Sequence, residues 1–158
     1  MRLLFRGFVG PVVILALFSC SKNPPYEGKS AAELETMLQN SDPAVQAQGA
    51  FGLSRLGPEA RSAVPALTTA LKNSKPLVRQ NAALALAQIG PEAHAAVPAL
   101  IETLHDPEWT VRRQAAQALG HIGPKAASAV PALQKLSKDP DTLVRKAAEQ
   151  ALKKIRKV

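Results

Sequence analysis

The sequence is poor in cysteine and in aromatic residues. Its 158 residues include one cysteine, one tryptophan and one tyrosine, and aromatic residues make up 4% of the chain. One cysteine excludes a disulfide within the chain, and so few aromatic rings argue against a β-sandwich or a large-pocket enzyme. Alanine and leucine are abundant instead, which favours closely packed helices.

The patterns that accompany catalysis and metal binding are also missing. The three histidines, His94, His105 and His121, have no partner at i, i+4 and no cysteine or carboxylate at ligand spacing, so no metal site is predicted. No glycine-rich phosphate loop follows a strand, and the acidic residues form no privileged pair for acid–base chemistry. We therefore expect neither enzymatic activity nor a bound cofactor.

Positive charge is concentrated in the last third of the chain. Residues 22–105 hold seven Lys and Arg against seven Asp and Glu, whereas residues 106–158 hold eleven against five. This asymmetry indicates either an anionic partner, such as nucleic acid or an anionic membrane surface, or a solvated helix face at a chain end. Aromatic residues interleaved with these cations, on which bases could stack, are absent, which argues against nucleic acid. The candidate cations are Arg112, Arg113, Lys135, Lys138, Arg145, Lys146 and the cluster at 153–157.

The N-terminus has the layout of an export signal. A short basic start, "MRLLFR", precedes the apolar run "GFVGPVVILALF", which is typical of a secretory signal and short for a membrane span. The next residues, "LFSC" (Leu17 to Cys20), resemble the bacterial lipobox. The resemblance implies a signal peptide over residues 1–19, cleavage after Ser19, and an acyl lipid on Cys20 that anchors the chain in a membrane. The alternative is an uncleaved signal anchor with an incidental cysteine.

A polar, proline-rich segment follows the cysteine. "SKNPPYEGK" has two prolines, a glycine and no apolar period, so we expect residues 20–29 to be a flexible tether. In bacteria that sort lipoproteins by the residue after the cysteine, Ser21 indicates the outer membrane. The expected location is therefore the bacterial cell envelope, with the periplasmic face of the outer membrane favoured over the inner membrane.

The rest of the chain is one motif repeated. "GPEARSAVPALTTALKN", "GPEAHAAVPALIETLHD" and "GPKAASAVPALQKLSKD" begin at Gly57, Gly90 and Gly123, 33 residues apart. The segments between them repeat with the same period, as the valines at 45, 78, 111 and 144 show. Four copies in one register without a gap are strong evidence for a repeat architecture.

Each repeat is predicted to form two helices. The first opens with a capping residue and a proline, and ends at the glycine of the GP dipeptide. The second carries its valine and leucines inward. The expected openings of the first helices are Asp42-Pro43, Lys75-Pro76, Asp106-Pro107 and Asp139-Pro140. The helix over 43–56 is expected to be the least stable, because Gly49 and Gly52 replace alanines there.

These features predict an all-α fold for residues 30–158. We expect a short right-handed α-solenoid of about three and a half to four helix pairs, with a half unit at each end and three full units between. The pattern "DP…VR..AA.ALG.IGP.A..AVPAL...L.D" resembles HEAT repeats, specifically the short bacterial type also seen in phycobilisome-lyase-like proteins. The resemblance implies a protein-binding scaffold whose second helices line the concave surface. It also raises bilin-lyase chemistry, for which an exported lipoprotein is in the wrong compartment.

Two groups of residues are candidate sites. Three arginines each follow a polar turn residue by six positions, which predicts either a structural ladder between repeats or a polyanion-binding stripe. The arginines are Arg79, Arg112 and Arg145, and the turn residues are Asn73, Asp106 and Asp139. The candidate binding surface consists of outward positions of the second helices and Trp109, an exposed anchor or a packing residue: Thr69, Lys72, Glu102, His105, Trp109, Lys135 and Lys138. Together they predict a membrane-tethered scaffold for an unidentified protein partner.

Overall fold

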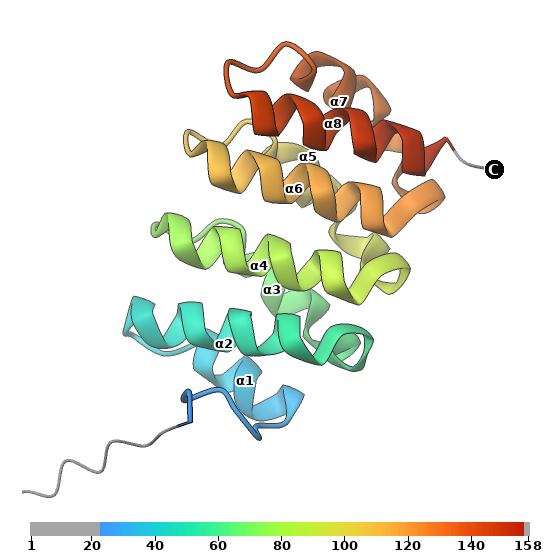
Figure 1. Ribbon diagram of the computed structural model, residues 1–158. Helices are drawn as coiled ribbons and strands as arrows, with labels where there is room; N and C mark the ends of the chain where they lie inside the picture. The colour runs from blue at the N-terminus through green and yellow to red at the C-terminus, as the bar shows by residue number, and fades with distance from the viewer. Residues whose placement is uncertain (1–22, 157–158) are drawn as a thin grey trace, which may run out of the picture.

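The computed structural model describes residues 23–156, which form a stack of helices in two layers (Figure 1). The predicted signal peptide and the lipidation site at Cys20 lie outside the described residues. The long helices have 14 residues each and are α2 (Pro43–Leu56), α4 (Pro76–Ile89), α6 (Trp109–Ile122) and α8 (Thr142–Ile155). The short helices are α1 (Ala31–Leu38), α3 (Val64–Ala70), α5 (Val97–Thr103) and α7 (Val130–Leu136).

A 3₁₀ helix joins each of the first three long helices to the next short helix. These segments are η1 (Gly57–Ala63), η2 (Gly90–Ala96) and η3 (Gly123–Ala129). The predicted all-α solenoid is confirmed, and no strand occurs in residues 23–156. The 3₁₀ segments were not expected from the sequence. They place the second proline of each repeat in the first turn of the short helix, where a missing N–H costs no hydrogen bond.

Glycine ends the long helices α2, α4 and α6, as predicted. Gly57, Gly90 and Gly123 have φ values of 58°, 72° and 72°, in the left-handed region that side chains disfavour. A proline follows each glycine directly. The chain therefore reverses at the same point of these three repeats.

The starts of the long helices differ from the prediction in two of four repeats. Asp106 and Asp139 do not cap α6 and α8, which begin two residues later than expected. Instead, Asp106 Oδ1 accepts from the Glu108 N–H at 2.9 Å, and Asp139 Oδ1 accepts from the Asp141 N–H at 2.9 Å. These i to i+2 bonds are Asx turns, which compete with helix capping for the same side chain. In α2 the expected cap is present, since Asp42 Oδ1 accepts from the Ala44 N–H.

Each short helix packs mainly against the long helix that follows it. The pairs are therefore α1–α2, α3–α4, α5–α6 and α7–α8, four units, in agreement with the predicted three and a half to four helix pairs. The long helices also pack directly on one another from α2 to α8, whereas the short helices after α3 contact the 3₁₀ segments more than one another. The largest fully buried side chains form the core: Leu34, Leu53, Leu67, Val78, Leu86, Ile89, Leu100, Leu104, Val111, Leu119, Ile122 and Leu133.

The helical run Pro76–Thr103 has the length and hydropathy of a membrane span. Half of its most apolar window is buried inside the protein, however, and the run contains the chain reversal at Gly90. Its hydropathy is that of a repeat core that faces two neighbours.

The two glycines of α2 allow α1 and the preceding turn to approach closely. A Cβ on Gly49 would lie 2.7 Å from Met37 Cβ and 2.8 Å from the Leu34 carbonyl oxygen. A Cβ on Gly52 would lie 2.5 Å from Leu34 Cδ2 and 2.8 Å from Tyr26 Cβ. The glycines are thus packing residues, and their presence does not by itself identify α2 as a weak helix.

The segment before α1 folds back onto α2. The ring of Tyr26 packs edge-to-face on Phe51, with centroids 5.1 Å apart, and Tyr26 is only partly exposed. Ser30 then caps α1 in a capping box with Glu33, whose carboxylate accepts from the Ser30 N–H at 2.9 Å. The predicted tether over residues 20–29 therefore contacts the fold from Tyr26 onward, since this turn packs the only tyrosine against α2.

Candidate functional site

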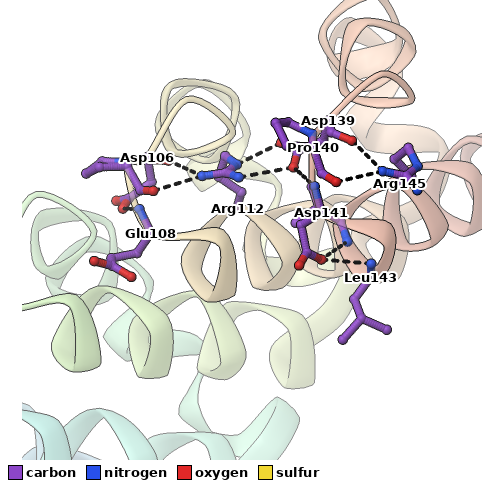
Figure 2. Close-up of polar contacts among 10 residues, drawn as sticks. Asp106, Glu108, Arg112, Asp139, Pro140, Asp141, Leu143 and Arg145 are labelled. Atoms are coloured by element: carbon purple, nitrogen blue, oxygen red, sulfur yellow. Dashed lines mark hydrogen bonds and ion pairs between the residues drawn. The ribbon is translucent and has the colours of Figure 1, made fainter.

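The predicted arginine ladder runs along the turns that precede the long helices (Figure 2). Arg79 donates to Asp106 of the next repeat, with Nε 2.6 Å from Oδ2 and Nη2 2.9 Å from Oδ1. Arg112 contacts Asp139 in the same forked way, at 2.8 and 3.0 Å. Nη1 of each arginine donates to the backbone carbonyl of its own turn, at Asn73 and Asp106. Each arginine therefore ties two consecutive repeats together.

The two ends of the ladder differ from its middle. Near the N-terminus an amide pair replaces the ion pair, with Asn73 Nδ2 donating to Gln46 Oε1 at 2.8 Å. At the C-terminal end Arg145 has no following repeat among the described residues, and it donates to the Asp139 carbonyl and to Thr142 Oγ1. This geometry occupies the guanidinium groups in protein contacts, and leaves them poorly placed to bind a polyanion.

Burial and hydrogen bonding set the electrostatics of the ladder. Burial acts to raise the pKa of the Asp139 carboxyl, but the hydrogen bonds from Arg112 and from the Asp141 N–H outweigh it and hold the pKa below its ordinary value. The side chains of Arg112 and Asp139 are 15% and 6% exposed. Hydrogen bonding to the same carboxylate raises the pKa of Arg112.

The predicted binding residues on the short-helix side lie at the surface as separate groups. Lys72 and Glu102 meet in an ion pair of 3.1 Å with both side chains about two-thirds exposed, which contributes little to stability. Thr69 borders a cavity of about 340 Å³ near the α1–α3 contact. No described contact brings together the remaining members on this side, His105, Lys135 and Lys138.

Trp109 lies on the other layer, in the first turn of α6. It is 37% exposed, and the Arg113 guanidinium carbon lies 5.4 Å from its ring centroid. Leu77 and Leu143, in the first turns of the neighbouring long helices, are also exposed, at 56% and 45%. Arg113 Nε is buried without a hydrogen-bond partner among the described residues.

A glutamine-lined cavity of about 180 Å³ opens between α4, α6 and α8. Three of its polar residues, Gln88, His121 and Lys154, occupy equivalent positions of consecutive repeats, and Gln117 and Gln150 form a second equivalent pair. Because the long helices stack with a 33-residue period, these positions lie side by side. We call this the glutamine cavity, and define its polar residues as Gln88, Gln114, Gln117, His121, Gln150 and Lys154.

The glutamine cavity was not predicted from the sequence, because the second helices were expected to line the concave binding surface. In the structure this polar cavity is lined by the long helices α4, α6 and α8 instead. The signal was present in the sequence as a column of long-helix positions, Gln88, His121 and Lys154, that stay polar in a mostly alanine and leucine pattern.

Two further cavities lie at the N-terminal end of the stack. One of about 570 Å³ separates the turn at Pro24–Lys29 from α2, and one of about 270 Å³ lies between Phe51 and Leu77. Residues 1–22 precede the first cavity directly and are outside the described part of the chain, so no site is assigned there. No group of three His, Cys, Asp or Glu side chains in residues 23–156 could hold a metal ion.

Comparison with known families agrees with the repeat geometry. The family model for HEAT repeats matches residues 31–104 and again residues 97–158, which together include every helix of the fold. The chain belongs to the HEAT-repeat family. No curated protein matches it significantly.

Several solved structures share the HEAT-like stack. An engineered protein is 31% identical, with a TM-score of 0.69 over 79% of this chain and 62% of its own. A designed armadillo repeat protein in complex with the peptide (KR)4 is 20% identical, with a TM-score of 0.70 over 79% of this chain and 64% of its own. The complex of CpcE and CpcF of phycocyanin lyase from Nostoc is 24% identical, with a TM-score of 0.60 over 89% of this chain and 71% of its own.

These structural matches support conclusions about the fold and not about the function. The chain spans less than two thirds of the engineered and armadillo proteins, and below 25% identity a structural match shows the fold alone. Scaffolds and a lyase share this HEAT-like fold, so the fold does not identify an activity. Function has to be argued from the surface of this chain.

Proposed function

We propose that this HEAT-repeat protein is a non-enzymatic scaffold that binds a protein partner on its long-helix face, the outward surface of α2, α4, α6 and α8. The observation that carries the proposal is the glutamine cavity, where side-chain amides from three consecutive repeats converge. Amide groups donate and accept at once, so they suit the N–H and C=O groups of a protein segment. No catalytic role is assigned to them, because amides do not act as general acids, general bases or nucleophiles near neutral pH.

The short-helix side offers a poorer binding surface. Its exposed charges are partly neutralised locally, as in the Lys72–Glu102 pair. The long-helix face offers exposed apolar anchors as well as amides, with Leu77, Trp109 and Leu143 at the start of three helices. Interfaces typically place such anchors beside polar groups.

Site-specific crosslinking tests the binding face. A photoreactive amino acid replaces Gln117 in one variant and Lys138, on the short-helix side, in a matched control. We expect discrete protein adducts in the producing cells from the Gln117 variant and none from the control. Equal adducts from both positions, or none from either, would contradict the proposed face.

We further propose that an acyl lipid on Cys20 tethers the scaffold to a membrane of the bacterial cell envelope, with the periplasmic face of the outer membrane favoured. The support is the sequence "LFSC" after a basic and apolar start. Mass measurement and detergent partitioning of the full chain, beside a Cys20→Ser variant, test this. A di- or triacyl mass increase and detergent-phase recovery, both lost in the variant, are expected, and an unmodified mass would contradict the tether.

The C-terminal positive charge favours a second candidate function, binding of a polyanion or an anionic membrane surface. Lys146, Lys153 and Lys154 on α8 have no ion-pair partner in residues 23–156. This alternative predicts an affinity for DNA or anionic vesicles that falls steeply with salt. Absence of binding at low salt would remove it.

A further inference from the structure

We propose that the glutamine cavity receives an acidic side chain from an extended segment of the protein partner. The inference rests on the proposed function and specifies the chemistry that the long-helix face recognises. Its essential residues are Gln114, which lies in the cavity wall, and Lys154, which lies at the rim. An aspartate or glutamate side chain is the occupant that matches both the volume and the charge.

The charge around the cavity has one sign. The helices α4, α6 and α8 contain a single acidic residue, Glu149, which is absent from the cavity lining. Lys154 does line it, and has no ion-pair partner among the described residues. Arg113 on α6 and Lys146 on α8 are likewise free of ion pairs in that part of the chain. The cavity therefore attracts anions and repels cations.

Gln114 lines the same cavity from α6. The residue is only 7% exposed, but its side-chain amide is not among the buried unpaired groups of residues 23–156, so the amide reaches solvent through the cavity. The equivalent position on α8 is Ala147, so the stack does not need an amide there to pack. A ligand carboxylate would accept a hydrogen bond from the Gln114 amide.

The cavity fits a peptide better than a nucleic acid. Its volume of about 180 Å³ is sufficient for one carboxylate side chain. Its lining has no aromatic side chain on which a base could stack. The remaining glutamines, Gln88, Gln117 and Gln150, offer both donors and acceptors, which a peptide backbone requires and a phosphate does not.

Fluorescence anisotropy with defined peptides tests the inference on the full chain in mild detergent. The probes are three labelled octapeptides, alternating Asp–Glu, Ser–Gln and Lys–Arg, and a labelled oligothymidine of twelve nucleotides. The variants are Gln114→Ala, Lys154→Glu and, as a control with the same charge change on the short-helix side, Lys138→Glu. Lys138 and Lys154 are both exposed, so neither reversal disturbs the core.

The Asp–Glu peptide should bind at least about tenfold more tightly than the Ser–Gln and Lys–Arg peptides. Lys154→Glu should weaken it by roughly tenfold and Gln114→Ala by about ten- to a hundredfold, the range for a hydrogen bond to a charged group. Lys138→Glu should change the affinity by less than about twofold, because an exposed charge far from the site is screened.

Four results would overturn the inference. Equal loss from Lys138→Glu and Lys154→Glu would show attraction to overall charge only. Tighter binding of the oligothymidine would assign the face to nucleic acid. Tight binding of the Ser–Gln or Lys–Arg peptide, weakened by Gln114→Ala, would refute acidic selectivity but leave the protein-binding function standing. Absence of all peptide binding would refute the inference, while the crosslinking experiment separately decides the proposed function.

Discussion

Arg112 and Asp139 are joined by two hydrogen bonds across neighbouring repeats, from Nε to Oδ2 at 2.8 Å and from Nη2 to Oδ1 at 3.0 Å. Both side chains are largely buried, and Asp139 also accepts from the Asp141 N–H. One carboxylate thus sets the turn before α8 and fastens α8 to the preceding repeat. Asp106 has the same double role toward Arg79 and the turn before α6, and Asp139 is the ladder position whose pKa is shifted, which makes it the one to test.

Asp139→Asn should reduce the free energy of unfolding at pH 7 by about 2–3 kcal/mol, because Arg112 loses a charged partner in a buried site. The folded-state pKa of Asp139 is below its ordinary value of about 3.9, so its contribution is complete above that pH and is lost as the pH falls through the folded-state pKa. The difference between wild type and variant should therefore shrink below about pH 4. Urea unfolding followed by circular dichroism at pH 7, 5 and 3 measures it. Glu149→Gln, at an exposed position, is the control, and a constant difference at all three pH values would contradict the assignment.

The first contact of the arginine ladder, the amide pair of Gln46 and Asn73, can be converted to match the other contacts, each of which we call a rung. Gln46→Arg combined with Asn73→Asp replaces the 2.8 Å amide contact with the ion pair found at the Arg79–Asp106 rung. The double variant should gain about 1 kcal/mol of unfolding free energy, because bidentate charged hydrogen bonds are stronger than neutral ones. Each single variant should gain nothing. Thermal and urea unfolding of all four proteins in a double-mutant cycle gives the coupling energy, and a coupling near zero would refute the equivalence of the rungs.

Gly49→Ala should destabilise the protein although alanine is the better helix former. Helix propensity favours alanine by about 0.5–1 kcal/mol. The new Cβ would lie 2.8 Å from the Leu34 carbonyl oxygen, which is backbone and cannot rotate away. We expect a net loss of about 1–3 kcal/mol, the usual cost of overpacking. Chemical unfolding measures it, with Arg55→Ala on the exposed side of the same helix as the control. A more stable Gly49→Ala variant would show that α1 can move away from α2.

Arg113→Met should leave the protein as stable as wild type or more so. The substitution removes a buried Nε donor that has no partner in the described structure, a gain of about 1–3 kcal/mol. It also removes the cation from the face of Trp109, a loss of about 0.5–1 kcal/mol. Thermal unfolding measures the balance. Trp109 is the only tryptophan, so its fluorescence reports the altered contact directly. A loss of more than 1 kcal/mol would indicate that Arg113 has a stabilising partner.

Much of the architecture could be predicted from the sequence because the same helix-forming pattern recurs in every repeat. The 33-residue period, the glycines that end the first three long helices and the valine and leucine spacing identify the helices and their inward faces. The arginine spacing indicated the ladder residues. It could not show that the carboxylate partner of Arg79 is Asp106 of the next repeat, because that contact spans 27 residues and depends on how the repeats stack.

Tertiary structure decided the rest. Local rules placed helix caps at Asp106 and Asp139, but their carboxylates are used for Asx turns and for the ladder, so α6 and α8 begin two residues later. The same holds for the glutamine cavity, since Gln114 and Lys154 are 40 positions apart and meet only because the long helices stack directly on one another. The sequence by itself determined the repeat, the helices and their buried faces, because these depend on spacing within one unit. The contacts between units, and with them the face that can bind a partner, depend on packing over distances that no local pattern records.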